Sequence, residues 1–141
     1  MEWLVFSQSA EPSLDVAAWD AHARRFFDAR LVSAGVGGPG ELRVVVTPKQ
    51  GPAGERTVVA RLRTAHELAL AEEAEVRQGG GLGLLARRCP TVWSVACDGP
   101  DDRVALLLAA VLAGVGLGPI VDPRGPEIFG VKTARAKLQV S

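Results

Sequence analysis

The sequence predicts an α+β fold: a ferredoxin-like sandwich, in which an antiparallel sheet carries helices on one face, with a helical addition at the C-terminal end. Residues 41–47 and 57–63 alternate apolar and polar side chains, as strands with one buried face do. Segments with helical spacing separate the strand-like segments in the split order of a ferredoxin-like sheet. A doubly wound parallel sheet is disfavoured, because its strands would be apolar on both faces.

The first half of the chain predicts a central strand, a helix and a hairpin. Residues 2–8 are almost continuously apolar and predict a strand buried on both faces. With Ser13 or Asp15 as the N-cap, apolar side chains then recur at helical spacing as far as Phe27, and a glycine cluster ends that element. The two alternating strands pair across a loop of turn-forming residues at 48–54.

The second half begins with a capped helix. Thr64 stands three residues before Glu67, which is the capping-box pattern, and the helix breaks at three consecutive glycines. The remaining predicted elements are a short helix at 82–88, a strand at 91–97, an apolar helix with Asp101 as its N-cap, a short extended piece at 118–123 and a last helix at 126–138. Asp101 and Asp102 also favour the positive end of the apolar helix.

Length and composition indicate one globular domain over residues 1–141. The chain is 48% hydrophobic and 23% charged, which excludes disorder, and its net charge of zero argues against nucleic-acid binding. Thirteen arginines against three lysines suggest a bacterial genome rich in G and C.

The sequence also favours a cytoplasmic protein. The N-terminal residues have no basic region, so a signal peptide is not expected. The uncharged run at 104–121 contains three glycines and a proline, which leave too short a helix to cross a membrane. Cys89 and Cys97 flank the start of a predicted strand, a separation that disulfide geometry does not bridge, and both are read as free thiols.

Motifs for cofactors and metals are weak. The glycines at 81 and 83 match the residue pattern of a dinucleotide-binding fingerprint, but a helical segment precedes them where that fingerprint requires a strand. No pair of closely spaced cysteines is present, so neither a metal nor a cofactor is expected. Cys89 lies beside Arg87 and Arg88, which would lower the pKa of an exposed thiol, and it is the candidate for a reactive thiol.

Alternation places Arg43, Arg61 and Arg63 on the outward face of the hairpin. One interpretation is that these arginines keep an open sheet face soluble. The other is a docking surface for an acidic partner or a phosphate-bearing ligand, with His66 as the nearest titratable group.

The long apolar helix has a second flank of small side chains. Leu106, Ala109 and Ala113 lie on this flank, away from the main stripe of bulky residues. A helix that is apolar all round has to be covered on more than one side. Either the C-terminal segment 128–138 packs over this flank, or a second subunit does, which would make these residues a self-association face.

These features favour a non-catalytic bacterial binding, adaptor or regulatory domain of the immunity or accessory type, which acts through protein–protein contacts, with a homodimer as one form. The alternative is a small ferredoxin-like enzyme or a protein that binds an anionic ligand. Its site would lie between the arginine-lined sheet face and the loop at 48–54.

Overall fold

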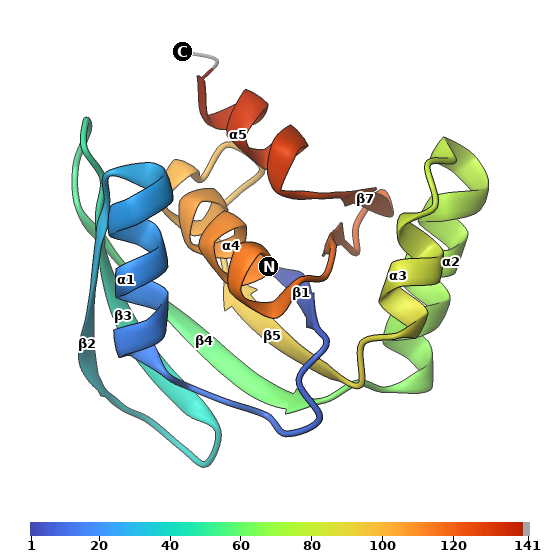
Figure 1. Ribbon diagram of the computed structural model, residues 1–141, viewed down its shortest axis with the longest axis horizontal. Coiled ribbons are helices and arrows are strands. Elements are labelled where there is room, and N and C mark those ends of the chain that lie inside the picture. The colour runs from blue at the N-terminus through green and yellow to red at the C-terminus, as the bar shows by residue number, and fades with distance from the viewer. Residues whose placement is uncertain (140–141) are drawn as a thin grey trace.

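The structure, a computed structural model, describes residues 1–139, over which the chain forms seven strands and five helices (Figure 1). The strands are β1 (Glu2–Ser7), β2 (Arg30–Val36), β3 (Glu41–Thr47), β4 (Gly54–Leu62), β5 (Thr91–Ala96), β6 (Ile120–Asp122) and β7 (Glu127–Phe129). The helices are α1 (Val16–Phe27), α2 (Ala65–Gln78), α3 (Leu82–Arg87), α4 (Arg103–Gly116) and α5 (Val131–Gln139).

All strands join one sheet in the order β2-β3-β4-β5-β1-β6-β7, and each neighbouring pair is antiparallel. The α+β class and the antiparallel sheet are therefore confirmed. The ferredoxin-like arrangement is not confirmed, because the described sheet has seven strands. The strand β1 is central and buried, as its continuous apolar run predicts.

The expectation that the helices lie on one face of the sheet is wrong. Neighbouring residues of a strand point to opposite faces, and in β1 they pack against different helices. Val5 belongs to a larger cluster of buried residues with α1 and α4, whereas Leu4 and Phe6 belong to a smaller cluster with α2 and α3. Both faces of the central strands thus carry helices (Figure 1).

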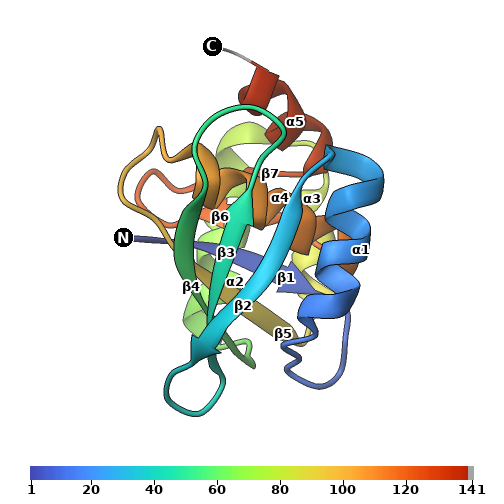
Figure 2. The same cartoon turned by 90° about the vertical axis from the view of Figure 1, so that its left-hand side faces the viewer.

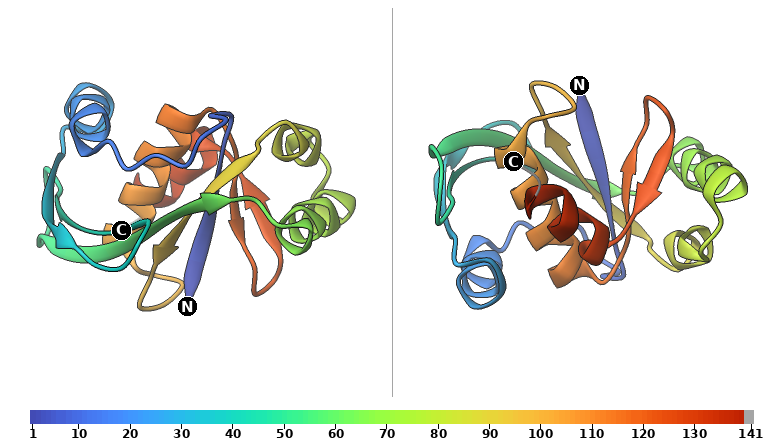
Figure 3. Two further views of the ribbon diagram at one scale, coloured as in Figure 1. Left: turned by 90° about the horizontal axis from the view of Figure 1, so that it is seen from below. Right: turned by 90° about the horizontal axis from the view of Figure 1, so that it is seen from above.

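The centre of the larger cluster is α4, whose side chains are apolar on every side. Ten of its fourteen residues are buried. The sheet curls around this helix, and α1 and α5 pack on it as well (Figure 3). Asp102 is its N-cap, one residue later than the Asp101 cap that the sequence predicts, and the helix ends at Gly116. No helix in the part of the chain from 1 to 139 has both the length and the apolar character to cross a bilayer.

The strands β2, β3 and β4 have one face without a helix over it (Figure 2). Val45 of β3 and its cross-strand partner Val32 point to this face, and the Val32 side chain is 53% exposed. Arg43 and Glu55 flank these valines. The outer face of this half of the sheet is thus a mixture of valine and charge.

The two outer strands of the sheet each receive a side-chain cap from a helix. Asp20 of α1 accepts a hydrogen bond of 2.8 Å from the backbone N–H of Leu31 in β2. Gln78 of α2 accepts one of 2.8 Å from the N–H of Ile128 in β7. Both strands lie outside the sequence prediction, and β7 occupies the beginning of the segment expected to be the last helix, which therefore starts at Val131.

Candidate functional site

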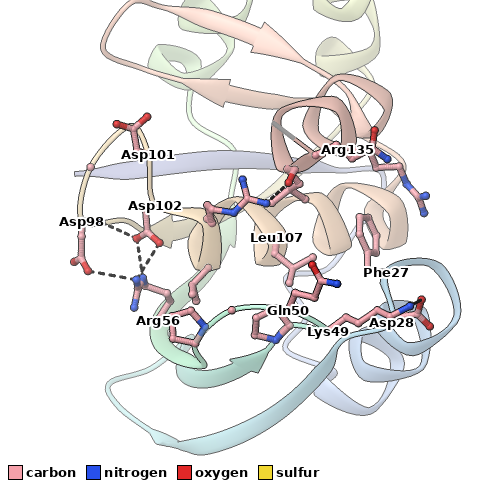
Figure 4. Close-up of a pocket in the computed structure, with 18 of the residues that line it drawn as sticks. Phe27, Asp28, Lys49, Gln50, Arg56, Asp98, Asp101, Asp102, Leu107 and Arg135 are labelled. Atoms are coloured by element: carbon pink, nitrogen blue, oxygen red, sulfur yellow. Dashed lines mark hydrogen bonds and ion pairs between the residues drawn. The ribbon is translucent and has the colours of Figure 1, made fainter. Parts of the chain in front are cut away.

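A cavity of about 880 Å³ opens where the β3–β4 loop, the β5–α4 loop and the C-terminal ends of α1 and α5 come together (Figure 4). Its lining consists of residues 26–28, 48–52, 98–104, 138 and 139, together with Arg56, Leu107 and Arg135. The sequence-predicted loop at 48–54 therefore forms one wall.

The floor of the cavity is apolar because α4 brings the edge of the larger cluster to the surface. Leu107 and Val104 of α4, Phe27 of α1 and Leu138 of α5 all belong to that cluster or pack against it, and all line the cavity. Gly54 allows β4 to approach α4 closely, since a Cβ there would lie 3.2 Å from both methyl carbons of Val104.

Arg56 and Asp102 form a two-pronged ion pair at one end of the cavity. The Arg56 Nε and Nη2 atoms donate to the two Asp102 oxygens over 2.8 and 2.9 Å. The same carboxylate accepts from the backbone N–H of Ala105 at 3.0 Å, as the N-cap of α4, and from that of Asp98 at 2.9 Å. Its side chain is only 3% exposed, so nearly all its hydrogen-bonding capacity is used inside the protein.

This pairing keeps both groups charged. Burial alone raises the pKa of Asp102, but the hydrogen bonds from Arg56 and from the backbone of Ala105 and Asp98 outweigh it, and the pKa lies below its ordinary value. The hydrogen bond to Asp102 raises the pKa of Arg56. Asp102 is therefore a structural carboxylate that holds the β5–α4 loop and the start of α4, and it is poorly suited to accept a proton from a ligand.

Charged side chains stand around the rim of the cavity. Lys49 lies 3.6 Å from Asp28, and both side chains are about 70% exposed. Arg135 donates to the carbonyl oxygen of Phe26 at 2.7 Å, and its guanidinium lies over the Phe27 ring, 4.5 Å from the centroid. At the opposite end, Asp98 is 85% exposed and lies 3.3 Å from Arg56.

The three arginines predicted to form a basic stripe are not gathered into one site, and none lines this cavity. Arg43 lies opposite Thr57, four residues from Arg61 along β4, which is about 13 Å of strand. Its nearest carboxylate is Glu55, at 4.0 Å. Arg61 pairs with the buried capping-box carboxylate of Glu67.

Arg63 has a structural role at the end of α3. Its Nη1 donates to the carbonyl oxygens of Ala86, Arg87 and Cys89 at 2.9, 3.0 and 2.9 Å. These carbonyls belong to the last turn of α3 and the residues just after it, so the guanidinium acts as a C-terminal cap that adds to the backbone hydrogen bond from Cys89 to Ala86. Its charge is turned toward the backbone of its own chain.

Two further candidates lie apart from the cavity. His66 is exposed in the first turn of α2, beside the Thr64 cap. Cys89 is fully buried, and burial raises the pKa of its thiol to about 11, although Arg63 acts in the opposite direction. The rationale for a reactive Cys89 assumed an exposed thiol beside Arg87 and Arg88, and the structure corrects that assumption, because the side chain is buried and its raised pKa disfavours the thiolate form.

The small-residue flank of the apolar helix is covered within the chain. Leu106, Ala109 and Ala113 are 7%, 0% and 2% exposed, because α1, α5 and the sheet pack around α4. Of the two coverings that the sequence leaves open, the structure contains the intramolecular one. In this fold, these side chains are not available to a second subunit.

Only some of the residues that line the cavity could be predicted from the sequence. The loop at 48–54 is predicted, and Asp101 and Asp102 are expected at the start of the apolar helix. Arg56 and Arg135 are not predicted, because they meet the loop only after the sheet and α5 have folded. One signal in the sequence could have indicated the cavity: the proline-containing turns at 48–52 and 98–101 each follow a strand of the same sheet.

Among residues 1–139, no group of three or more His, Cys, Asp or Glu side chains is arranged to hold a metal ion. Comparison of the chain with known protein families, with curated protein sequences and with solved structures finds no match.

Proposed function

We propose that this chain is a non-catalytic binding domain that holds a segment of a partner protein in the cavity between the β3–β4 loop, α4 and α5. The observation that carries the proposal is the arrangement of its polar groups. The largely buried pair Arg56 and Asp102 is satisfied internally, whereas Lys49, Asp28 and Asp98 stand exposed on the rim. What the cavity offers a ligand is an apolar floor surrounded by charge.

This arrangement resembles the anatomy of a protein interface more than that of a small-molecule site. Interfaces have an apolar centre enriched in aromatic residues and arginine, and a polar rim that stays accessible to solvent. Sites for small polar ligands instead place a few polar groups so that they converge inside the pocket. Here Leu107 and Phe27 supply the apolar centre, and Arg135 stacks at its edge.

The rival function, an enzyme or anion-binding protein at the arginine-lined sheet face, has less support. Arg61 and Arg63 are engaged by Glu67 and by the end of α3, which leaves Arg43 with Glu55 on the open face. A bacterial cytoplasmic location stays part of the proposal, and the free, buried state of Cys89 and Cys97 supports it, since a reducing compartment preserves free thiols.

The test is a selection of binding peptides from a displayed library of random eight-residue sequences, followed by mapping of each enriched peptide on the protein by NMR. The expected result is a set of enriched peptides with apolar residues that shift the amide signals of residues 48–52 and 98–104. A library with no enriched peptide would overturn the proposal, as would shifts confined to the open face of β2, β3 and β4.

A further inference from the structure

The two ends of the cavity differ in charge. At the end formed by the β5–α4 loop, three carboxylates, those of Asp98, Asp101 and Asp102, stand against one guanidinium, that of Arg56. Asp102 accepts two hydrogen bonds from Arg56 and neutralises most of its positive charge. Asp98 and Asp101 are exposed, so this end presents a negative surface to a ligand.

The opposite end has the reverse balance. Lys49 is paired with Asp28, whereas Arg135 is held by a neutral carbonyl oxygen and an aromatic ring, neither of which cancels its charge. Arg25 lies outside the lining, and its guanidinium is 5.1 Å from the centroid of the Phe26 ring. Arg103, the remaining cation of the lining, donates to the Leu138 carbonyl oxygen of α5.

The apolar floor lies between these ends. Figure 4 shows Leu107 of α4 between Asp98 and Asp101 on one side and Arg135, Phe27 and Lys49 on the other. A bound segment that places an apolar side chain over Leu107 therefore extends toward carboxylates in one direction and toward cations in the other. Complementary charge at a rim fixes the register and direction of a bound partner.

The geometry points to a directional site: the occupant is an extended peptide segment in which an apolar residue stands between a basic side chain, directed at Asp98 and Asp101, and an acidic side chain, directed at Arg135 and Lys49. This inference rests on the proposed function and adds the charge pattern of the ligand and the direction in which it lies.

The experiment repeats the peptide selection with single charge reversals at each end. Asp101→Lys reverses the acidic end, and it leaves the Asp102 cap in place. Lys49→Glu reverses the basic end at an exposed loop position. Arg135→Glu is a second variant for that end, and its result counts only if the circular dichroism spectrum matches that of the wild type, because Arg135 also stacks on Phe27.

The wild type is expected to enrich peptides with a basic residue on one side of the apolar residue and an acidic residue on the other. Asp101→Lys should remove only the preference for the basic residue. Lys49→Glu should remove only the preference for the acidic residue. The affinity for a peptide selected on the wild type should fall about three- to tenfold in each variant, as is usual for rim charges. The double variant should select the reversed charge order.

The matched controls are Glu73→Lys on α2 and Arg88→Glu after α3, which reverse exposed charges outside the cavity lining. Both should select the same peptides as the wild type. Apolar peptides without a charge order, or a charge order that the cavity variants leave unchanged, would overturn this inference and leave the proposed function standing. A library in which no peptide is enriched would remove the proposed function and this inference together.

Discussion

The two buried clusters on either side of the central strands are built differently. In the larger one, helices and sheet both contribute bulky side chains, among them Trp19 of α1 and Leu108 of α4. In the smaller one, the fully buried side chains from α2 and α3 are the alanines at 71, 74 and 86, which pack on Leu4 and Phe6 of β1. Alanine buries little apolar area, so this side gains less from the hydrophobic effect.

On the side of the smaller cluster, hydrogen bonds and ion pairs compensate for the smaller gain from the hydrophobic effect. Arg61 holds Glu67 at the start of α2, Arg63 caps the end of α3, and Gln78 joins the end of α2 to β7. The comparison explains why arginines that look like a ligand site in the sequence serve as clamps in the structure. It also explains the position of the cavity, which lies where the larger cluster reaches the surface.

The largest expected effect is a truncation in the larger cluster. Trp19 is 1% exposed and packs edge to face on Trp93, with ring centroids 5.7 Å apart. Trp19→Ala should lower the free energy of unfolding by about 3–5 kcal/mol. Urea denaturation measures this loss, and Ala74→Gly in the smaller cluster, expected to cost about 1 kcal/mol, is the comparison. Equal losses at the two positions would contradict the difference between the clusters.

The next effect concerns the ion pair beside the cavity. Asp102→Ala leaves the Arg56 guanidinium, whose side chain is 18% exposed, without its main partner and removes the cap of α4. We expect a loss of about 3 kcal/mol in the free energy of unfolding. Asp98→Ala removes the exposed partner of the same arginine and should cost less than about 1 kcal/mol. If the two variants unfolded at the same urea concentration, Asp102 would not have the structural role assigned to it.

A smaller effect is expected from the clamp on α3. Arg63→Ala deprives three backbone carbonyls of their common donor, which should lower the free energy of unfolding by about 1–2 kcal/mol. Hydrogen exchange should show the loss first in α3. Arg88→Ala, one residue beyond this helix and exposed, should be neutral. Uniform loss of protection over the whole chain, without an early loss in α3, would argue against a local clamp.

The smallest expected effect is a pH dependence that arises from His22 of α1. Burial, followed by the charges of Arg135 and Arg25, lowers the pKa of His22 below its ordinary value of 6.5. The unfolded chain therefore takes up a proton at this histidine before the folded one does, so the contribution of His22 to stability is fully present well above pH 6.5 and is lost as the pH falls through and below that value. His22→Gln should flatten this dependence between pH 7.5 and 5.5 in urea titrations, whereas His66→Gln should retain it, since His66 is exposed. An unchanged slope in His22→Gln would assign the dependence to another group.

Much of the fold could be predicted because local signals agree with tertiary packing. The capping box of Thr64 and Glu67, the aspartates at the start of α4 and the alternation of β3 and β4 each act within a few residues. β2 escaped prediction because its alternation is broken by a register shift between Ser33 and Gly35, and β7 because three residues are too few for a pattern. The helices were expected on one face of the sheet only. The continuous apolar run of β1 indicated otherwise, since a strand that is apolar on both sides has to be covered on both.

The candidate site could be predicted only in outline. The loop at 48–54 is conspicuous in sequence, but a cavity depends on what stands opposite the loop, and Arg135 lies 79 positions after Arg56. Alternation places Arg43 and Arg61 on one face of the hairpin, but Arg63 lies beyond the end of β4 and the three arginines do not form one site. Alternation does not predict the position of α3, where the carbonyl oxygens at and just after the end of the helix accept hydrogen bonds from Arg63.

The side-chain caps on the two outer strands bear on how the protein behaves at high concentration. A free strand edge is a template on which further chains add, and this addition is the first step of fibril growth. Asp20 occupies the N–H of Leu31 on one edge and Gln78 that of Ile128 on the other, and the register shift in β2 interrupts the first edge again. Removing both caps, in Asp20→Ala with Gln78→Ala, would therefore turn a sheet of fixed width into one that can be extended by its own copies.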